Sequence, residues 1–173
     1  LGKIKNKIAN TEPVFRNSNL IDINIRSVKS GDINNSHEFT NGLSSYEYCN
    51  LSRFAGLSKN LDLISFSSLY QSSAISSLIS EGIWYAIDGM NNVIDENIDL
   101  NSENFIFYNV TVNNYDLKFV KSLITNRWWV SLENTNLVQI EKSYIPCVED
   151  DYLLSKNSIL SDRILSRIKN KIS

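Results

Sequence analysis

The chain has 173 residues, of which 42% are hydrophobic and 21% charged, and its formal net charge is −2. This composition is typical of a globular domain and excludes a disordered chain. No basic patch predicts binding to nucleic acid, and no apolar run approaches the roughly 20 residues of a membrane span. The two cysteines, Cys49 and Cys147, are isolated thiols, which favour a reducing, cytoplasmic location.

The first predicted elements are a helix, a strand and a loop. Apolar residues at helical spacing predict a helix over residues 1–9, and Pro13 is expected to end any helix before it. Residues 19–25 are predicted as a strand, because apolar side chains alternate there with polar ones. Turn-forming glycines and asparagines predict a loop over residues 30–43.

The next predicted element is a helix that runs to about Ala55. Ser44 or Ser45 can cap its first turn, and Glu47 lies near the position of a capping-box acid. Gly56 is a natural residue to end this helix.

In the rest of the chain, segments with the residue spacing of a strand alternate with segments with the spacing of a helix. Residues 61–69 are predicted as a short, mostly buried strand. Residues 74–90 have a wide apolar face and predict a helix that is packed on both sides or nearly so. Further strands are predicted over 104–112, 127–133 and 135–140, and further helices over 116–124, 148–157 and 160–172.

This alternation of strands and helices predicts an α/β protein with a parallel sheet.

Several sequence motifs that are typical of enzymes are missing. The chain has no glycine-rich phosphate loop and no G-x-S-x-G elbow. Its single histidine, His37, lies in a polar stretch and is expected at the surface. The aromatic residues Trp84, Tyr85, Trp128 and Trp129 are expected to belong to the core.

Four segments resemble, in order and spacing, the C-terminal half of one family. They read GLSSYEYCNLSRFAGLS, IWYAIDGMNN, KSLITNRWWVSLE and YIPCVEDDYLLSKNSILSDRI. The chain is similar to the formimidoylglutamase-like branch of the arginase/agmatinase (ureohydrolase) family. The resemblance implies that residues 1–173 form one domain, the C-terminal part of a three-layer αβα parallel-sheet fold. It also implies an N-terminal half, in the same polypeptide or a separate chain, and assembly into a homo-oligomer.

The resemblance implies a specific chemistry as well. Family members hydrolyse linear guanidines or amidines with two manganese ions that activate a hydroxide. The strand that supplies their metal ligands aligns with residues 20–26, so that Asn24 and Arg26 stand where the metal aspartates are expected. An amide binds a hard dication poorly, and a guanidinium repels it. A register shifted by two residues would instead bring Asp22 to this position, as a fallback ligand.

A second position of the family's site also lacks its acid, because no carboxylate lies between Asp62 and Glu81. The sequence therefore favours a degenerate, catalytically inactive ureohydrolase-like domain, retained for structure or assembly, with no catalytic residue, metal or cofactor. The alternative is part of an active manganese-dependent hydrolase of arginine, agmatine or formimidoylglutamate, with ligands supplied by the N-terminal half. An unrelated α/β binding domain is a third hypothesis. Whether the chain is an enzyme stays open at this point.

Overall fold

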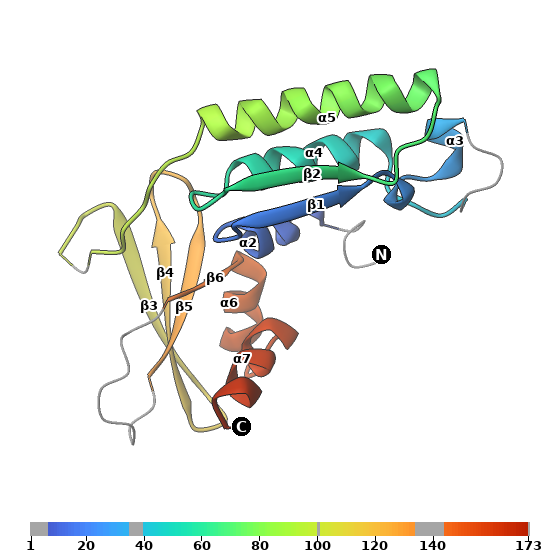
Figure 1. Ribbon diagram of the computed structural model, residues 1–173. Coiled ribbons are helices and arrows are strands. Elements are labelled where there is room, and N and C mark those ends of the chain that lie inside the picture. Colours follow the sequence, from blue (N-terminus) through green and yellow to red (C-terminus); the bar gives the residue numbers. More distant parts are fainter. Residues whose placement is uncertain (1–6, 35–39, 100, 134–143, 173) are drawn as a thin grey trace. The chain divides into compact units, whose positions relative to one another are not determined.

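The computed structural model describes residues 7–34, 40–99, 101–133 and 144–172 (Figure 1). It is an α/β structure with a two-stranded parallel sheet and a four-stranded antiparallel sheet. The parallel sheet predicted from the alternation of elements is therefore only part of the structure. In these ranges no helix is long and apolar enough to cross a membrane.

The chain divides into two compact units, Leu1–Asp95 and Glu96–Ser173. The first unit contains the parallel sheet and the second the antiparallel one. Each unit has a hydrophobic cluster of its own. A single domain over residues 1–173 stays a prediction beside this division.

The parallel sheet of the first unit pairs β1 (Leu20–Asn24) with β2 (Leu63–Ser67). Ile21 and Ile23 are buried on one face, as expected for side chains that alternate along a strand. Both strands were predicted from the sequence, but β2 is not mostly buried, since Leu63 is 55% exposed. The reason is that this sheet buries only one of its faces.

Helix α4 (Ser45–Gly56) connects the two strands and makes their parallel pairing possible. Its predicted capping box is confirmed. The Glu47 N–H donates to Ser44 Oγ (3.2 Å), and the Ser44 N–H donates to Glu47 Oε2 (2.7 Å). These two bonds satisfy backbone donors that the first turn of a helix leaves unpaired.

Helix α5 (Ser73–Asn91) packs closely against α4. A Cβ atom on Gly56 would lie 2.0 Å from the Ala86 carbonyl oxygen, and one on Gly89 would lie 2.3 Å from the Arg53 carbonyl oxygen. Only glycine permits this approach. Gly56 is the last residue of α4, as predicted, and packing makes the glycine necessary there.

One side of α5 is exposed, which differs from the predicted packing on both sides. Trp84 is 74% exposed, and Ile83, Ile87 and Met90 are exposed as well. The core placement predicted for Trp84 and Tyr85 is therefore wrong. The cause is that α5 contributes to the core mainly through another stripe of small and apolar residues, namely Ile75, Leu78, Gly82, Ala86 and Gly89.

The chain before β1 forms the short turns η1 (Ile8–Thr11) and α2 (Glu12–Phe15). Pro13 does not end a helix here but lies in the first turn of α2, where its missing N–H costs no hydrogen bond. Of the helix predicted over residues 1–9, residues 1–6 lie outside the described ranges.

The segment after β1 is less irregular than predicted. It contains the turns η2 (Ile25–Ser27) and α3 (Ser30–Ile33). One helical turn thus interrupts the loop expected over residues 30–43. Residues 35–39, with His37, lie outside the described part of the chain.

The antiparallel sheet of the second unit has the order β3-β4-β5-β6. Its strands are β3 (Phe105–Val112), β4 (Tyr115–Ser122), β5 (Trp128–Glu133) and β6 (Ile145–Cys147). The helix predicted over residues 116–124 is wrong, because this segment is β4.

The two-residue turn before β4 explains the difference. Asn113 and Asn114 have φ values of 49° and 67°, the left-handed conformation that joins two strands in a tight hairpin. The turn pairs Val112 with Tyr115 and continues the ladder to Phe105 opposite Ser122. The extended segment predicted over residues 135–140 lies outside the described ranges.

Helices α6 (Glu149–Lys156) and α7 (Asp162–Ile172) confirm the two predicted C-terminal helices. Ile164 and Ile168 of α7 join Phe119, Val130 and other side chains of the sheet in one buried cluster. Trp128 and Trp129 are buried, as predicted.

The carboxylate of Asp151 joins α6 to α7. Its Oδ2 accepts from the Val148 N–H at 3.0 Å and from Arg163 Nη1 at 2.5 Å. Asp151 is buried, and Arg163 is half-buried. Replacing this carboxylate by an amide removes the negative charge that pairs with Arg163 and weakens the cap on the Val148 N–H.

We therefore expect Asp151→Asn to lower the free energy of unfolding by about 2 kcal/mol, measured by urea denaturation. Glu149→Gln is the matched control, because it removes an exposed carboxylate from the same helical turn. Equal losses of unfolding free energy in the two variants would show that the ion pair between Asp151 and Arg163 does not stabilise the fold.

Candidate functional site

The candidate site lies at the carboxyl ends of the two parallel strands, where open α/β sheets usually bind ligands. Asp22 and Asn24 of β1 lie on the face opposite the buried isoleucines. The register pairs them with Ser65 and Ser67 of β2. Four polar side chains therefore share one face of the sheet. For Asp22 and Asn24, the alternation of polar and apolar residues in the sequence predicts this shared face.

Asp22 is the only carboxylate among these four residues. It is exposed, and its Oδ2 accepts a hydrogen bond of 2.7 Å from Ser67 Oγ. The bond crosses from one strand to the other. It fixes the carboxylate against β2 and uses one of its oxygens.

Asn24 caps the turn that follows β1. Its Oδ1 accepts from the Arg26 backbone N–H at 2.9 Å and begins the turn η2. Asparagine commonly bonds the backbone two residues ahead in this way. Because β1 ends at Asn24, Arg26 is in the turn and does not continue the line of Asp22 and Asn24 along the strand.

These residues do not fit a site for two manganese ions. Such a site needs several carboxylates or imidazoles, whereas the three predicted residues are one carboxylate, Asp22, one amide, Asn24, which is already bonded, and one arginine, Arg26. Across the described ranges, no group of three or more His, Cys, Asp and Glu residues is arranged to hold a metal ion.

A second group of polar side chains lies between α4 and α5, and the sequence analysis did not identify it. Cys49 Sγ is 4.0 Å from Glu81 Oε2, and burial, assisted by the charge of Glu81, raises the pKa of the Cys49 thiol to about 11. Burial also raises the pKa of the neighbouring Tyr48, with smaller contributions from Cys49 and Asp22. Cys49 therefore stays a thiol at neutral pH and is a poor nucleophile.

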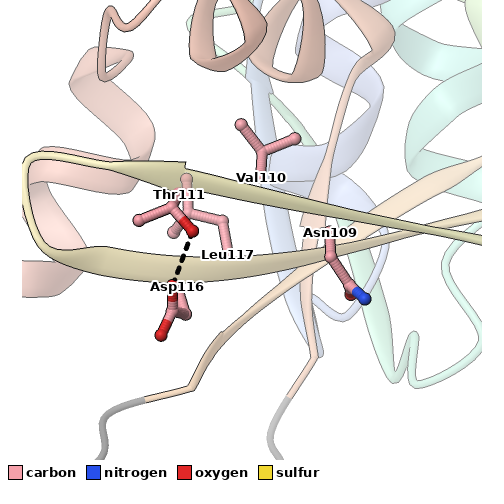
Figure 2. A pocket seen from close by; sticks show the side chains of 5 residues that line it. All are labelled: Asn109, Val110, Thr111, Asp116 and Leu117. Carbon is pink, nitrogen blue, oxygen red and sulfur yellow. Dashed lines mark hydrogen bonds between the residues drawn. The ribbon is translucent and has the colours of Figure 1, made fainter.

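A hollow of about 200 Å³ lies beside the β3–β4 hairpin (Figure 2). Thr111 Oγ1 donates to Asp116 Oδ1 at 2.7 Å across the hairpin. Asp116 is the one ionisable side chain among the lining residues, and its carboxylate is already bonded. The hollow therefore lacks a catalytic set. Its lining consists of Asn109, Val110, Thr111, Asp116 and Leu117.

The carboxylate of Asp32 has a structural role near the candidate site. Its Oδ2 accepts from the Ser45 N–H (2.8 Å) and Ser45 Oγ (3.1 Å), and its Oδ1 lies 3.2 Å from Lys29 Nζ. Burial by itself would raise the pKa of Asp32, but the bonds from Ser45 and Lys29 outweigh it and lower that pKa below 3.8. Asp32 thus holds the start of α4 beside the segment that follows β1.

Comparisons with known protein families, curated proteins and solved structures find no match to this chain. Of the predicted site residues, the structure brings Asp22 and Asn24 together on one face and places Arg26 in the next turn. The ureohydrolase resemblance therefore stays a proposal.

The bonds of Asp32 predict how stability depends on pH. Because the pKa of Asp32 is lower in the folded chain than the ordinary value of 3.8, its stabilisation is complete above that value and is lost as the pH falls through the folded pKa. We expect Asp32→Asn to flatten the loss of unfolding free energy between about pH 5 and pH 2, measured by urea titrations. Glu103→Gln, at an exposed carboxylate, is the control; an unchanged slope in Asp32→Asn would contradict the prediction.

Proposed function

We propose that the chain is a degenerate ureohydrolase-like domain of the formimidoylglutamase-like branch, without catalytic activity and retained for structure or assembly. The observation that supports this most directly is the bond from the Arg26 N–H to Asn24 Oδ1. At the position that aligns with a metal aspartate, the side chain of Asn24 is hydrogen-bonded to the backbone of the turn that follows it. The carboxylate on the same strand, that of Asp22, is bonded to Ser67.

The proposal at the level of the fold is that residues 1–173 are the C-terminal part of a three-layer αβα parallel-sheet domain. The succession β1-α4-β2-α5 supports it, because parallel strands joined by a helix are the repeating unit of such domains.

The uncovered face of the parallel sheet supports the proposed N-terminal half. Leu20 is 68% exposed and its partner in the register, Leu63, is 55% exposed. Parallel sheets are normally covered on both faces, and two strands alone are marginally stable. We therefore propose that further strands extend this sheet and that helices cover this face, from the same polypeptide or a separate chain, and that the whole assembles as a homo-oligomer.

The alternative is an active manganese-dependent hydrolase of linear amidines or guanidines. The exposed carboxylate of Asp22, in β1, is the observation that favours it. In that case, Asp22 is the ligand that this chain contributes, and the N-terminal half supplies the others.

Activity and metal content distinguish these two proposals. With manganese added, we expect no release of urea or formamide from arginine, agmatine or formimidoylglutamate above the uncatalysed rate. Elemental analysis after dialysis should likewise find far less manganese than the roughly two ions per chain of a two-metal hydrolase. Release that a chelator and Asp22→Asn both abolish would overturn the inactive domain and support the alternative.

The capping role of Asn24 has a separate test in stability. Asn24→Ala should lower the free energy of unfolding by about 1 kcal/mol, because the Arg26 N–H loses its acceptor. Asn24→Asp is the matched control, since aspartate caps equally well, and it should unfold close to the original chain. If Asn24→Ala caused no loss in urea denaturation, the side chain would be available for another role.

A further inference from the structure

The outer strand β3 lacks the protections that a strand's own sequence and pairing can give to a sheet edge. Its eight residues, Phe105–Val112, include no charged residue, proline or glycine. All eight pair with β4 in one continuous register. Natural edge strands are usually short, charged, bulged or interrupted by proline. The other edge follows this rule, because β6 has only three residues and contains Pro146.

The turn after β3 determines which backbone groups point outward. In a two-residue hairpin the flanking residues, here Val112 and Tyr115, form a hydrogen-bonded pair. Bonded and non-bonded pairs alternate along antiparallel strands, so that the N–H and C=O groups of Phe107, Asn109 and Thr111 point away from β4. Within the ranges that the structure describes, no backbone hydrogen bond outside the strand ladder reaches these three residues.

We propose that the outer edge of β3 pairs with β3 of a second copy of this chain, antiparallel and around a two-fold axis. The two four-stranded sheets then form one continuous sheet. A two-fold centred on Tyr108 sets Ile106 opposite the partner's Val110 on one face, and Phe107 opposite the partner's Asn109 on the other. Because β3 carries no charge, no register of this pairing places like charges opposite each other.

A second copy fits this edge better than a foreign extended segment. Any extended peptide could bond the same outward groups, but a disordered one loses conformational entropy when it is ordered. The β3 of another copy is already held extended by its eight pairs with β4.

The protected edge explains why the pairing would end at two copies. A sheet with two open edges could add copies without limit and form a fibre. Here β6 is short and contains Pro146, which cannot donate to a ladder. Pairing therefore uses the same edge on both copies and closes as a dimer. The inference concerns only Glu96–Ser173 and does not rest on the ureohydrolase proposal.

The test is sedimentation velocity of the chain over a range from about 1 μM to several hundred micromolar, because an interface of one strand pair is small and weak. We expect a reversible monomer–dimer equilibrium. Asn109→Lys should weaken it at least about fivefold, since it places two lysines at the centre of the pairing. Asn109→Pro should weaken it about tenfold or more, because it removes an N–H that points outward.

Asn91→Lys is the matched control, because it makes the same change at an exposed residue of α5 and should leave the equilibrium unchanged. Thermal melts of the variants establish that they fold. Amide exchange gives a local measurement: the N–H groups of Phe107, Asn109 and Thr111 should exchange more slowly as the concentration of the chain rises. A chain that stays monomeric throughout, or a dimer that both variants at Asn109 leave intact, would overturn the proposal.

Discussion

The close contact between α4 and α5 is the constraint on which the first unit depends. Gly56 and Gly89 let each helix backbone approach the other to a distance that a Cβ atom would not permit. The two helices can therefore lie together on one face of the two-stranded sheet, where they bury Ile21 and Ile23. The opposite face keeps Asp22 and Asn24 exposed, so the helix contact also determines where a site can be.

The segments that carry the family resemblance have folding roles in this structure. Asp151 and Arg163, from the last of these segments, form the ion pair between α6 and α7. Ser44 and Glu47, from the first, cap α4. A chain can retain such residues for stability after the chemistry is lost, because a fold and the site built on it are maintained by different interactions. This separation is what an inactive domain of a catalytic family requires.

Much of the first unit could be predicted from local sequence. The alternation of Ile21 and Ile23 with polar residues identified β1 and placed Asp22 and Asn24 on one face. The spacing of Ser44 and Glu47 identified the start of α4. The bonds of the site residues could not be predicted, since they depend on where β1 ends and on which strand lies beside it.

The wrong predictions for β4 and for Trp84 also arose because local sequence does not determine the contacts of a segment. Apolar residues in the segment of β4 fit either period, and its length suited a short helix as well as a strand. The pair Asn113–Asn114 was the available signal for a hairpin, because both residues tolerate positive φ. The exposure of Trp84 could not be read from its apolar character, since it depends on which side of α5 has neighbours.

The two sheets also differ in how far apart their partners lie along the chain. Val112 and Tyr115 meet across a two-residue turn, and β4 and β5 are consecutive as well. Leu20 and Leu63 meet only after α4 has been completed between them. Closing such a long loop costs chain entropy before the contacts that offset this cost can form. Sheets whose paired strands lie far apart in the sequence therefore form slowly. During refolding, the hairpin of β3 and β4 should therefore be ordered first, and the parallel pair, with the candidate site at its carboxyl end, should form later.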